Sequence, residues 1–245
     1  MKWSSFTPAN LREKSRQLHR RWLARRYALP VVELADLAPP DTAIAPPILE
    51  HICMPPHYYR HDHDDFTPLM KLARARQPKV IVELGTAHGN TTANLCRNCP
   101  AARIYTVNAP VEEMTGAITT FGLSREEIGC VYRQHGYAAQ VNQIYANTLH
   151  LDLAPHLAGQ KVDLGIVDAC HDTDYVLNDF HKLRPHLAAQ GLILLHDTHP
   201  SMDDHLLGSY VACLKLRQQG FDVRWLRHTW WAVWQPQWPV PAAPA

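Results

Sequence analysis

The sequence predicts a doubly wound α/β fold, and three observations support this prediction. Short apolar runs alternate with segments of helical spacing across residues 79–234. Several of these runs are apolar at nearly every position, which is typical of parallel strands that are covered on both faces. The first run ends in a glycine, which permits a tight turn toward the next helix. Ligands of such folds bind beyond the carboxyl ends of the strands, so candidate site residues are sought there.

The elements follow from the pattern of apolar residues, taken in chain order. We expect strands at residues 79–84, 103–108, 141–146, 162–168, 192–196, 222–226 and 230–234. Helices are expected at residues 91–98, 174–187 and 206–219. In the second of these helices, apolar residues recur on one face, and Pro185 limits where the helix can end. Strands that alternate with helices in this way specify a parallel sheet.

Residues 1–50 and 236–245 differ in composition from the region between them. Residues 1–29 are strongly basic, and their apolar positions fall near helical spacing, which predicts an amphipathic helix. We interpret this helix as packed on the domain or on a partner subunit; an anionic partner, a nucleic-acid patch or a targeting segment are the alternatives. A proline-rich segment completes residues 1–50, and residues 236–245 are expected to form a proline-rich tail. The α/β domain is therefore expected to span residues 51–235.

Composition and charge exclude several classes of protein. Hydrophobic residues make up 46% of the 245 residues, which is enough for a substantial core. The formal net charge of +1 provides no overall field for nucleic acid or a membrane surface, so neither is expected as a partner. No apolar run is long enough to span a bilayer, and the N-terminus lacks the pattern of a secretory signal. The six scattered cysteines indicate reduced thiols, and together these features predict a cytoplasmic protein.

The first motif that carries chemistry follows the first expected strand, in the run Glu83-Leu84-Gly85-Thr86-Ala87-His88-Gly89-Asn90-Thr91. The two glycines allow a tight turn and the close approach of a ligand to the start of the next helix. Free backbone N–H groups at that point favour an anionic group of the ligand. The run has neither the Gly-Lys-Ser/Thr of a phosphate-binding loop nor the G-x-G-x-x-G of dinucleotide sites. Its E-x-G-x-x-x-G pattern resembles motif I of the class I S-adenosylmethionine-dependent methyltransferases.

A second signature spans the fourth and fifth expected strands. It begins with Val162-Asp163-Leu164-Gly165-Ile166-Val167-Asp168-Ala169-Cys170-His171 and continues with Tyr175, Val176 and Asp179. It ends with Leu187-Ala188-Ala189-Gln190-Gly191-Leu192-Ile193-Leu194-Leu195-His196-Asp197-Thr198. This block resembles methyltransferase domains of the family 24 type, a group similar to macrocin O-methyltransferase and cephalosporin hydroxylase. The resemblance covers roughly residues 60–235, with Ala169 and Gln190 standing where the family often has glycine.

The resemblance implies a Rossmann-like, mostly parallel sheet of seven strands whose last strand is antiparallel. It also implies a methyltransferase that uses S-adenosyl-L-methionine to O-methylate a small-molecule substrate. By that resemblance, the cofactor would be held by Glu83, Gly85, Thr86, Gly89, Thr91, Asn108, Asn147 and Asp168. Asn108 stands where an acidic residue commonly binds the ribose hydroxyls. An amide can still hydrogen-bond a hydroxyl, but it lacks the charge that strengthens the contact.

A candidate catalytic cluster lies at the ends of the fourth and fifth strands. Because adjacent strands lie roughly 4.8 Å apart, the carboxylates of Asp168 and Asp197 can converge on one ligand. Strand alternation would turn His196 elsewhere, although a strand end can relax that rule. In metal-dependent relatives acids at these strand ends hold Mg²⁺, so the resemblance makes Asp168, His196 and Asp197 candidate ligands of Mg²⁺ or another divalent metal. A histidine among them favours a transition metal. We expect His171 to act as general base, with Asp168 as the other catalytic residue.

Other interpretations of the sequence stay open. The cluster His57, Tyr58, Tyr59, His61, Asp62, His63, Asp64 and Asp65 precedes the first strand, and it could bind a metal, form a solvated loop or cover the substrate. The chain could also be a non-catalytic or accessory protein that keeps the fold, or a metal-dependent enzyme of another reaction class. The tryptophan-rich C-terminal end and the basic N-terminal helix favour a homo-oligomer, in the form of a dimer.

Overall fold

The computed structural model describes residues 14–15, 18–19, 21–23, 26–50, 65–114, 122–199 and 207–238. The strands within these ranges are β1 (Val31–Val32), β2 (Val80–Leu84), β3 (Arg103–Asn108), β4 (Val141–Tyr145), β5 (Val162–Val167), β6 (Leu187–Leu195), β7 (Arg224–Leu226) and β8 (Ala232–Trp234). The helices are α2 (Phe66–Arg76), α3 (Asn90–Asn98), α4 (Cys130–Gln134), α5 (Ala154–Leu157), α6 (Thr173–Leu183) and α7 (Leu207–Gln218). Short 3-10 turns lie at η2 (Leu34–Asp36), η4 (Val111–Glu113) and η5 (Arg184–His186). No helix within the described ranges is both long enough and apolar enough to cross a membrane.

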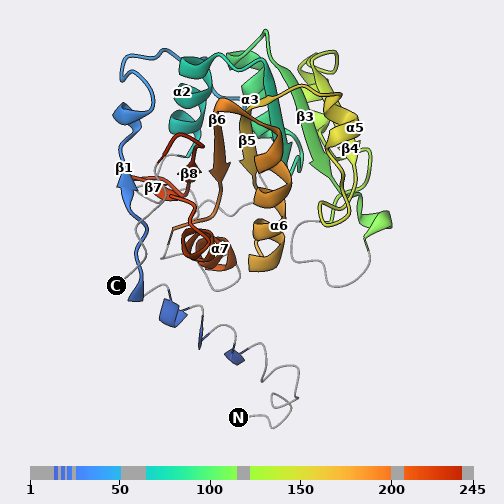
Figure 1. Cartoon of the computed structure of the whole chain (residues 1–245). Helices are drawn as coiled ribbons and strands as arrows, with labels where there is room; N and C mark the ends of the chain where they lie inside the picture. The colour runs from blue at the N-terminus through green and yellow to red at the C-terminus, as the bar shows by residue number, and fades with distance from the viewer. Residues whose placement is uncertain are drawn as a thin grey trace.

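All eight described strands join one sheet in the order β1-β7-β8-β6-β5-β2-β3-β4 (Figure 1). Neighbouring strands are parallel except at β8, which runs antiparallel to both β6 and β7. This arrangement confirms the predicted doubly wound, mostly parallel sheet with an antiparallel last strand. The seven predicted strands are all present. The structure adds β1, which pairs with β7 and is too short to produce a recognisable pattern in the sequence.

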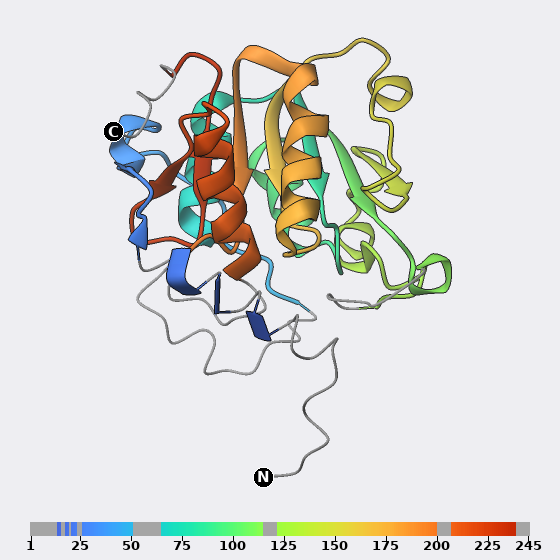
Figure 2. The ribbon, with the colours of Figure 1, turned by 60° about the horizontal axis from the view of Figure 1, so that its bottom comes forward.

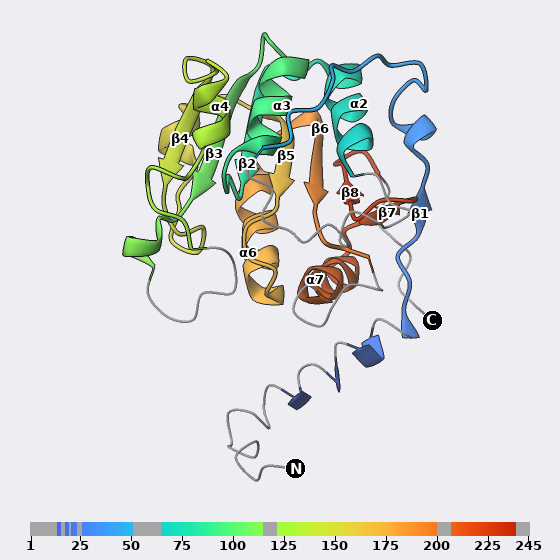
Figure 3. The ribbon, with the colours of Figure 1, turned by 180° about the vertical axis from the view of Figure 1, so that it is seen from behind.

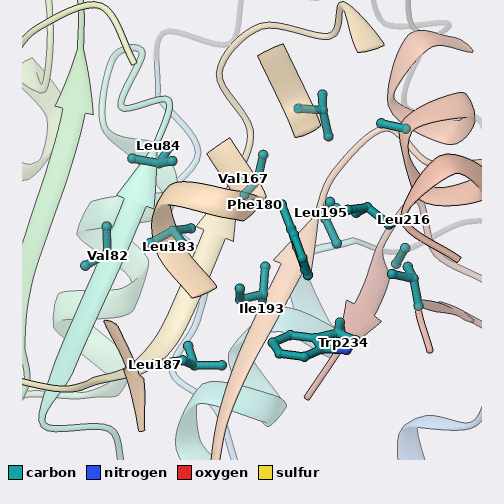
Figure 4. Close-up of a cluster of buried hydrophobic side chains, with 14 of the residues drawn as sticks. Val82, Leu84, Val167, Phe180, Leu183, Leu187, Ile193, Leu195, Leu216 and Trp234 are labelled. Carbon is teal, nitrogen blue, oxygen red and sulfur yellow. The ribbon is translucent and has the colours of Figure 1, made fainter. Parts of the chain in front are cut away.

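Helices cover both faces of the sheet, as buried parallel strands require. α2, α3 and α4 lie on one face, and α6 and α7 lie on the other (Figures 1 and 3). The apolar cluster beneath α6 contains Phe180, which packs against Trp234 with ring centroids 5.2 Å apart (Figure 4). The cluster beneath α2 and α3 contains Leu72 and Leu95, both fully buried. Figure 2 shows α6 and α7 side by side on their face of the sheet. Tyr210 of α7 donates a hydrogen bond to the carbonyl of Tyr27 at 2.8 Å.

The helix predicted over residues 174–187 ends earlier than its pattern suggested. α6 closes at Leu183, and Leu187 already belongs to β6. Pro185 lacks the N–H group that a continuing helix needs. Leu187 pairs instead with Val162 of β5, so β6 begins earlier than predicted.

A ladder of three asparagines on α3 fastens residues 45–50 to that helix. The asparagines are spaced four residues apart, so they share one face of α3. Their side-chain oxygens accept backbone N–H groups in the pairs Asn90–Glu50, Asn94–Ile48 and Asn98–Ala45, at 2.9, 2.8 and 2.9 Å. The amide nitrogen of Asn94 also donates to the carbonyl of Ile48 at 2.8 Å. Asn94 therefore satisfies both backbone groups of a residue that is buried.

We predict that Asn94→Ala lowers the free energy of unfolding by about 2–4 kcal/mol, because it leaves the buried N–H and C=O groups of Ile48 without partners. Urea denaturation followed by circular dichroism measures this loss. The control is Gln219→Ala, which removes only an exposed hydrogen bond to His181 and should change the stability by less than about 0.5 kcal/mol. Equal stability of the Asn94→Ala and wild-type proteins would show that the ladder does not hold the segment.

Candidate active site

The glycine turn after β2 lies against the end of β5. Gly85 has a φ of 112°, a backbone conformation that residues with side chains rarely adopt. A Cβ atom at this position would lie 2.0 Å from the carbonyl oxygen of Asp168, so only glycine fits. The N–H of Asp168 in turn donates to the carbonyl of Leu84 at 2.7 Å. The turn and the backbone of Asp168 are therefore held together at the carboxyl edge of the sheet.

A chain of buried polar side chains supports this turn from inside the fold. The Oε2 atom of Glu83 accepts hydrogen bonds from Thr92 and Thr106, each at 2.5 Å. Because Thr106 donates its proton to the carboxylate, it must accept from Thr86, which lies 2.7 Å away. Thr86 then accepts from Gln143 at 3.0 Å. The carboxylate can only accept, so it determines which group donates and which accepts in every hydrogen bond of this series.

Glu83 supports the turn rather than facing a ligand. Its side chain is buried, and burial raises the pKa of Glu83 to about 7, although the hydrogen bonds from Thr106 and Thr92 act in the opposite direction. Its Oε1 atom is buried and has no hydrogen-bond partner within the part of the chain that the structure describes.

The other predicted cofactor residues fall into two groups. Gly89 ends the turn in a left-handed conformation with φ of 87°, and Thr91 is partly exposed in the first turn of α3. Asn108 ends β3, where its Oδ1 atom accepts the N–H of Ala87 at 3.1 Å. These residues and Asp168 lie at or beside the turn.

Thr86 and Asn147 form the second group; like Asn108, whose Nδ2 atom donates to the carbonyl of Ala109 at 3.0 Å, they direct their side chains into the protein's own hydrogen bonds. Thr86 is buried and faces Thr106, as described above. The Oδ1 atom of Asn147 accepts the N–H of Leu149 at 2.9 Å, so this side chain shapes the turn that follows β4.

The two predicted carboxylates converge, because β5 and β6 are neighbouring parallel strands. His171 joins them, with its Nε2 atom 2.9 Å from Oδ2 of Asp197 and 3.8 Å from Oδ1 of Asp168. One ligand atom from each of the three residues lies within 4.8 Å of the others. Asp197 is buried, and the other two side chains are partly exposed. Among the described residues, these three are therefore close enough together to share one metal ion.

His196 faces the same cluster, although strand alternation alone would turn it away. Its Nδ1 atom lies 3.1 Å from Oδ1 of Asp168 and 3.5 Å from Oδ1 of Asp197. Asp197 has a φ of 54°, so the chain has left the extended conformation in which alternation holds. The ring of Trp231 packs against His196 with centroids 4.2 Å apart.

A further carboxylate, which the two signatures did not assign to the site, completes the cluster. Asp65 lies just before α2, and its Oδ2 atom is 3.2 Å from Nε2 of His196. Its Oδ1 atom accepts the N–H of Trp230 at 2.6 Å, and its carbonyl accepts Nε1–H of Trp231 at 3.0 Å. The only sequence signal for Asp65 was its place at the end of the His- and Asp-rich cluster. Residues 57–64 of that cluster lie outside the described residues.

Acids and imidazoles alternate in this cluster, and their charges stabilise one another. Burial alone would lower the pKa of His171, but hydrogen bonds and charges of Asp168 and Asp197 raise it to about 9. The same two carboxylates raise the pKa of His196 well above its usual value, against the effect of its burial. Burial favours a higher pKa for Asp168, but His196 and His171 hold that pKa well below its ordinary range. The metal-free cluster therefore carries imidazolium ions that donate to carboxylates.

The donor chemistry of the cluster fits a divalent cation. Carboxylate oxygens bind hard cations, whereas imidazole nitrogen is a ligand typical of transition metals such as Zn²⁺, Fe²⁺ or Cu²⁺. A cation bound to Asp168 and Asp197 would take the place of the histidine protons as the partner of these carboxylates.

We predict that the free energy of unfolding of the metal-free protein falls as the pH rises from 6.5 to about 9. The pKa of His171 is raised from 6.5 to about 9 in the folded protein, so its stabilising interactions are fully present below pH 6.5 and are lost through pH 9. Urea denaturation with a chelator present measures this fall, and His171→Gln should reduce it by an amount on the order of 2 kcal/mol. The exposed His181→Gln is the control. An unchanged pH dependence in His171→Gln would contradict the assignment.

Comparison with known proteins finds a matching family model and solved structures of similar fold. A family model described as a methyltransferase domain matches residues 82–198, just under half of the chain. A Staphylococcus aureus structure, provisionally named as a caffeoyl-CoA O-methyltransferase, is 17% identical with a TM-score of 0.51, over 69% of this chain and 82% of that one. The SAH-bound Podospora anserina methyltransferase PaMTH1 is 19% identical with a TM-score of 0.50, over 68% and 76%. Cofactor-bound Rv0187 from MTB is 19% identical with a TM-score of 0.50, over 91% and 88%.

At these identities the solved structures establish the shared fold, and the family match accounts for both signatures. The match begins within β2, just before the glycine turn, and ends at Thr198, just after the carboxylate cluster. Residues 82–198 of this chain therefore match a methyltransferase domain, and the chain shares the fold of solved methyltransferase structures.

Proposed function

We propose that the protein is an S-adenosylmethionine-dependent methyltransferase that methylates an oxygen of a small molecule with the help of a divalent cation. The observation that carries this proposal is the position of Asp168. Its backbone supports the glycine turn, while its side chain belongs to the cluster with His171 and Asp197. A cofactor site and a cluster of acid–base groups therefore share one edge of the sheet.

The residues of the turn suit the two ends of this cofactor. Backbone N–H groups at the start of α3, after Gly89, favour the cofactor's carboxylate. Asn108, at the end of β3, is the candidate for the ribose hydroxyls. When bound, S-adenosylmethionine supplies an electrophilic methyl group on a sulfonium. The protein's part is to hold an acceptor oxygen in line with that group, since positioning supplies much of the rate of such a displacement.

His171 is the group best placed to receive the proton of the acceptor hydroxyl. In the metal-free protein its Nε2 atom is engaged by Asp197 at 2.9 Å. Asp168 and Asp197 would hold a divalent cation, and Asp197 would then no longer engage the imidazole nitrogen of His171, which would be free for the acceptor. The same cation would orient the acceptor oxygen and favour its deprotonated form.

A partly exposed acid–base cluster favours a small-molecule acceptor, the substrate class that we propose. The proposal assigns no role to nucleic acid or to a membrane, and it leaves the protein in the cytoplasm as a homo-oligomer. The alternative, an accessory protein that keeps the fold without the reaction, rests on Asn108, which provides no charge for the ribose.

We predict that S-adenosylmethionine binds the purified protein and that Asn108→Asp tightens this binding about 3–10-fold. A carboxylate makes charge-assisted hydrogen bonds to the ribose hydroxyls, which are stronger than those of an amide. Isothermal titration calorimetry measures both affinities. Asn142→Asp is the matched control, because it makes the same change on β4, where the side chain of Asn142 accepts a hydrogen bond from Arg103. No binding heat at millimolar cofactor would refute the methyltransferase proposal.

We predict that Asp168→Asn, Asp197→Asn and His171→Gln each lower kcat by about 10²–10⁴-fold without unfolding the protein. Asn is the substitution of choice at position 197, because it tolerates the left-handed backbone that Ala would strain. Methyl transfer to a panel of hydroxylated acceptors, assayed with and without a chelator, is the measurement. Chelation should mimic the two Asp variants. If chelation does not change turnover while His171→Gln is inactive, His171 acts as a base and no cation takes part. Normal turnover in all three variants would refute both base catalysis by His171 and cation binding by the two aspartates.

A further inference from the structure

Asp65 makes two side-chain contacts that constrain each other. Its Oδ1 atom accepts the backbone N–H of Trp230 at 2.6 Å, and its Oδ2 atom lies 3.2 Å from Nε2 of His196. A carboxylate can only accept, so the Nε2 atom of His196 must carry a proton. The other ring nitrogen, Nδ1, is the one that faces Asp168 and Asp197.

We propose that Asp65 is a positioning residue that makes His196 a nitrogen ligand for a transition-metal ion. With Nε2–H held by Asp65, the proton that a cation replaces is the one on Nδ1. A metal-binding histidine typically donates its other ring N–H to a carboxylate in this manner, which fixes the ring and increases its basicity. This inference rests on the cation of the proposed function. It extends the site to Asp65, which is 131 positions from His196 in the sequence.

Packing around the imidazole supports this assignment. The ring of Trp231 lies 4.2 Å from that of His196, centroid to centroid, and its Nε1–H is bound by the carbonyl of Asp65. His196 is therefore enclosed between Asp65, Trp231 and the carboxylate cluster. A ring held on three sides keeps its Nδ1 atom aimed at Asp168 and Asp197, where a ligand atom is needed.

Asp65→Asn tests this assignment, because the amide has the same shape as the carboxylate but reverses the hydrogen bond between the side chain of residue 65 and Nε2 of His196. The N–H of Trp230 requires an acceptor, so the amide oxygen must stay on that side. The amide nitrogen then donates to Nε2 of His196, which moves the ring proton to Nδ1. A protonated Nδ1 cannot bind a metal ion, so the nitrogen ligand is lost although every residue of the cluster is present.

The experiment is a titration of the metal-free full-length protein with Co²⁺, followed by its visible absorption, with Mg²⁺ affinity measured by calorimetry. We expect Asp65→Asn to weaken Co²⁺ binding 10–100-fold and to change the visible spectrum, because one nitrogen ligand is removed. Mg²⁺ prefers oxygen ligands, so its affinity should change by less than 2-fold. In a His196→Ala background, Asp65→Asn should have no further effect on Co²⁺ binding, because Asp65 acts through that ring.

The matched control is Asp163→Asn, which makes the same change near the start of β5, where the carboxylate accepts N–H groups of Lys79 and Val80. It should leave both metal affinities unchanged. The proposal is overturned if the wild-type protein does not bind Co²⁺, if Asp65→Asn weakens Co²⁺ and Mg²⁺ equally, or if its effect persists without His196. Cofactor calorimetry is independent of these results. If S-adenosylmethionine binds normally but one of these three metal results is found, this inference is removed and the methyltransferase proposal stands. If the metal results are as expected but S-adenosylmethionine does not bind, only the methyltransferase proposal is removed.

Discussion

The contact between Gly85 and the carbonyl oxygen of Asp168 is the constraint on which the site depends. There is no room for a Cβ atom at that point, so the turn after β2 and the end of β5 approach as closely as backbones can. The main chain of Asp168 is therefore held by the glycine turn, and its side chain belongs to the acid–base cluster. Any movement of the glycine turn would also move a carboxylate of the acid–base cluster.

The sequence predicted the parts of the molecule that repeat a regular pattern. Apolar runs located the seven main strands, and neighbouring strands bring Asp168 and Asp197 together because parallel strands end at one edge. Two features could not be predicted in this way. The orientation of His196 depends on a single left-handed residue, Asp197, which interrupts the alternation of side chains. Asp65 comes from a distant segment, and only tertiary packing brings it to His196.

Buried polar networks were also beyond prediction from the sequence, for a related reason. Asparagine is a poor helix former and usually indicates a turn or a cap, yet three of them lie on one face of α3. Their partners are backbone groups of residues 45–50, which carry no side-chain signal. In the same way, the threonines around Glu83 look like ordinary strand and helix residues. Hydrogen bonds between segments that are distant in sequence leave no periodic trace, so motifs and periodicity cannot report them.

The asparagine ladder has a consequence for how this region can evolve. Because the ladder binds main-chain N–H and C=O groups, it recognises the path of residues 45–50 and not their side chains. Proline is the one residue excluded at the three bonded N–H positions, and the natural prolines Pro46 and Pro47 fall between them. Apart from Ile48, whose side chain is buried, and Glu50, whose carboxylate lies 2.7 Å from Nε2 of His135, the side chains of this segment can therefore change while its backbone keeps the same path along α3. Sequence comparison would rate the segment as variable, although its position beside the glycine turn is fixed.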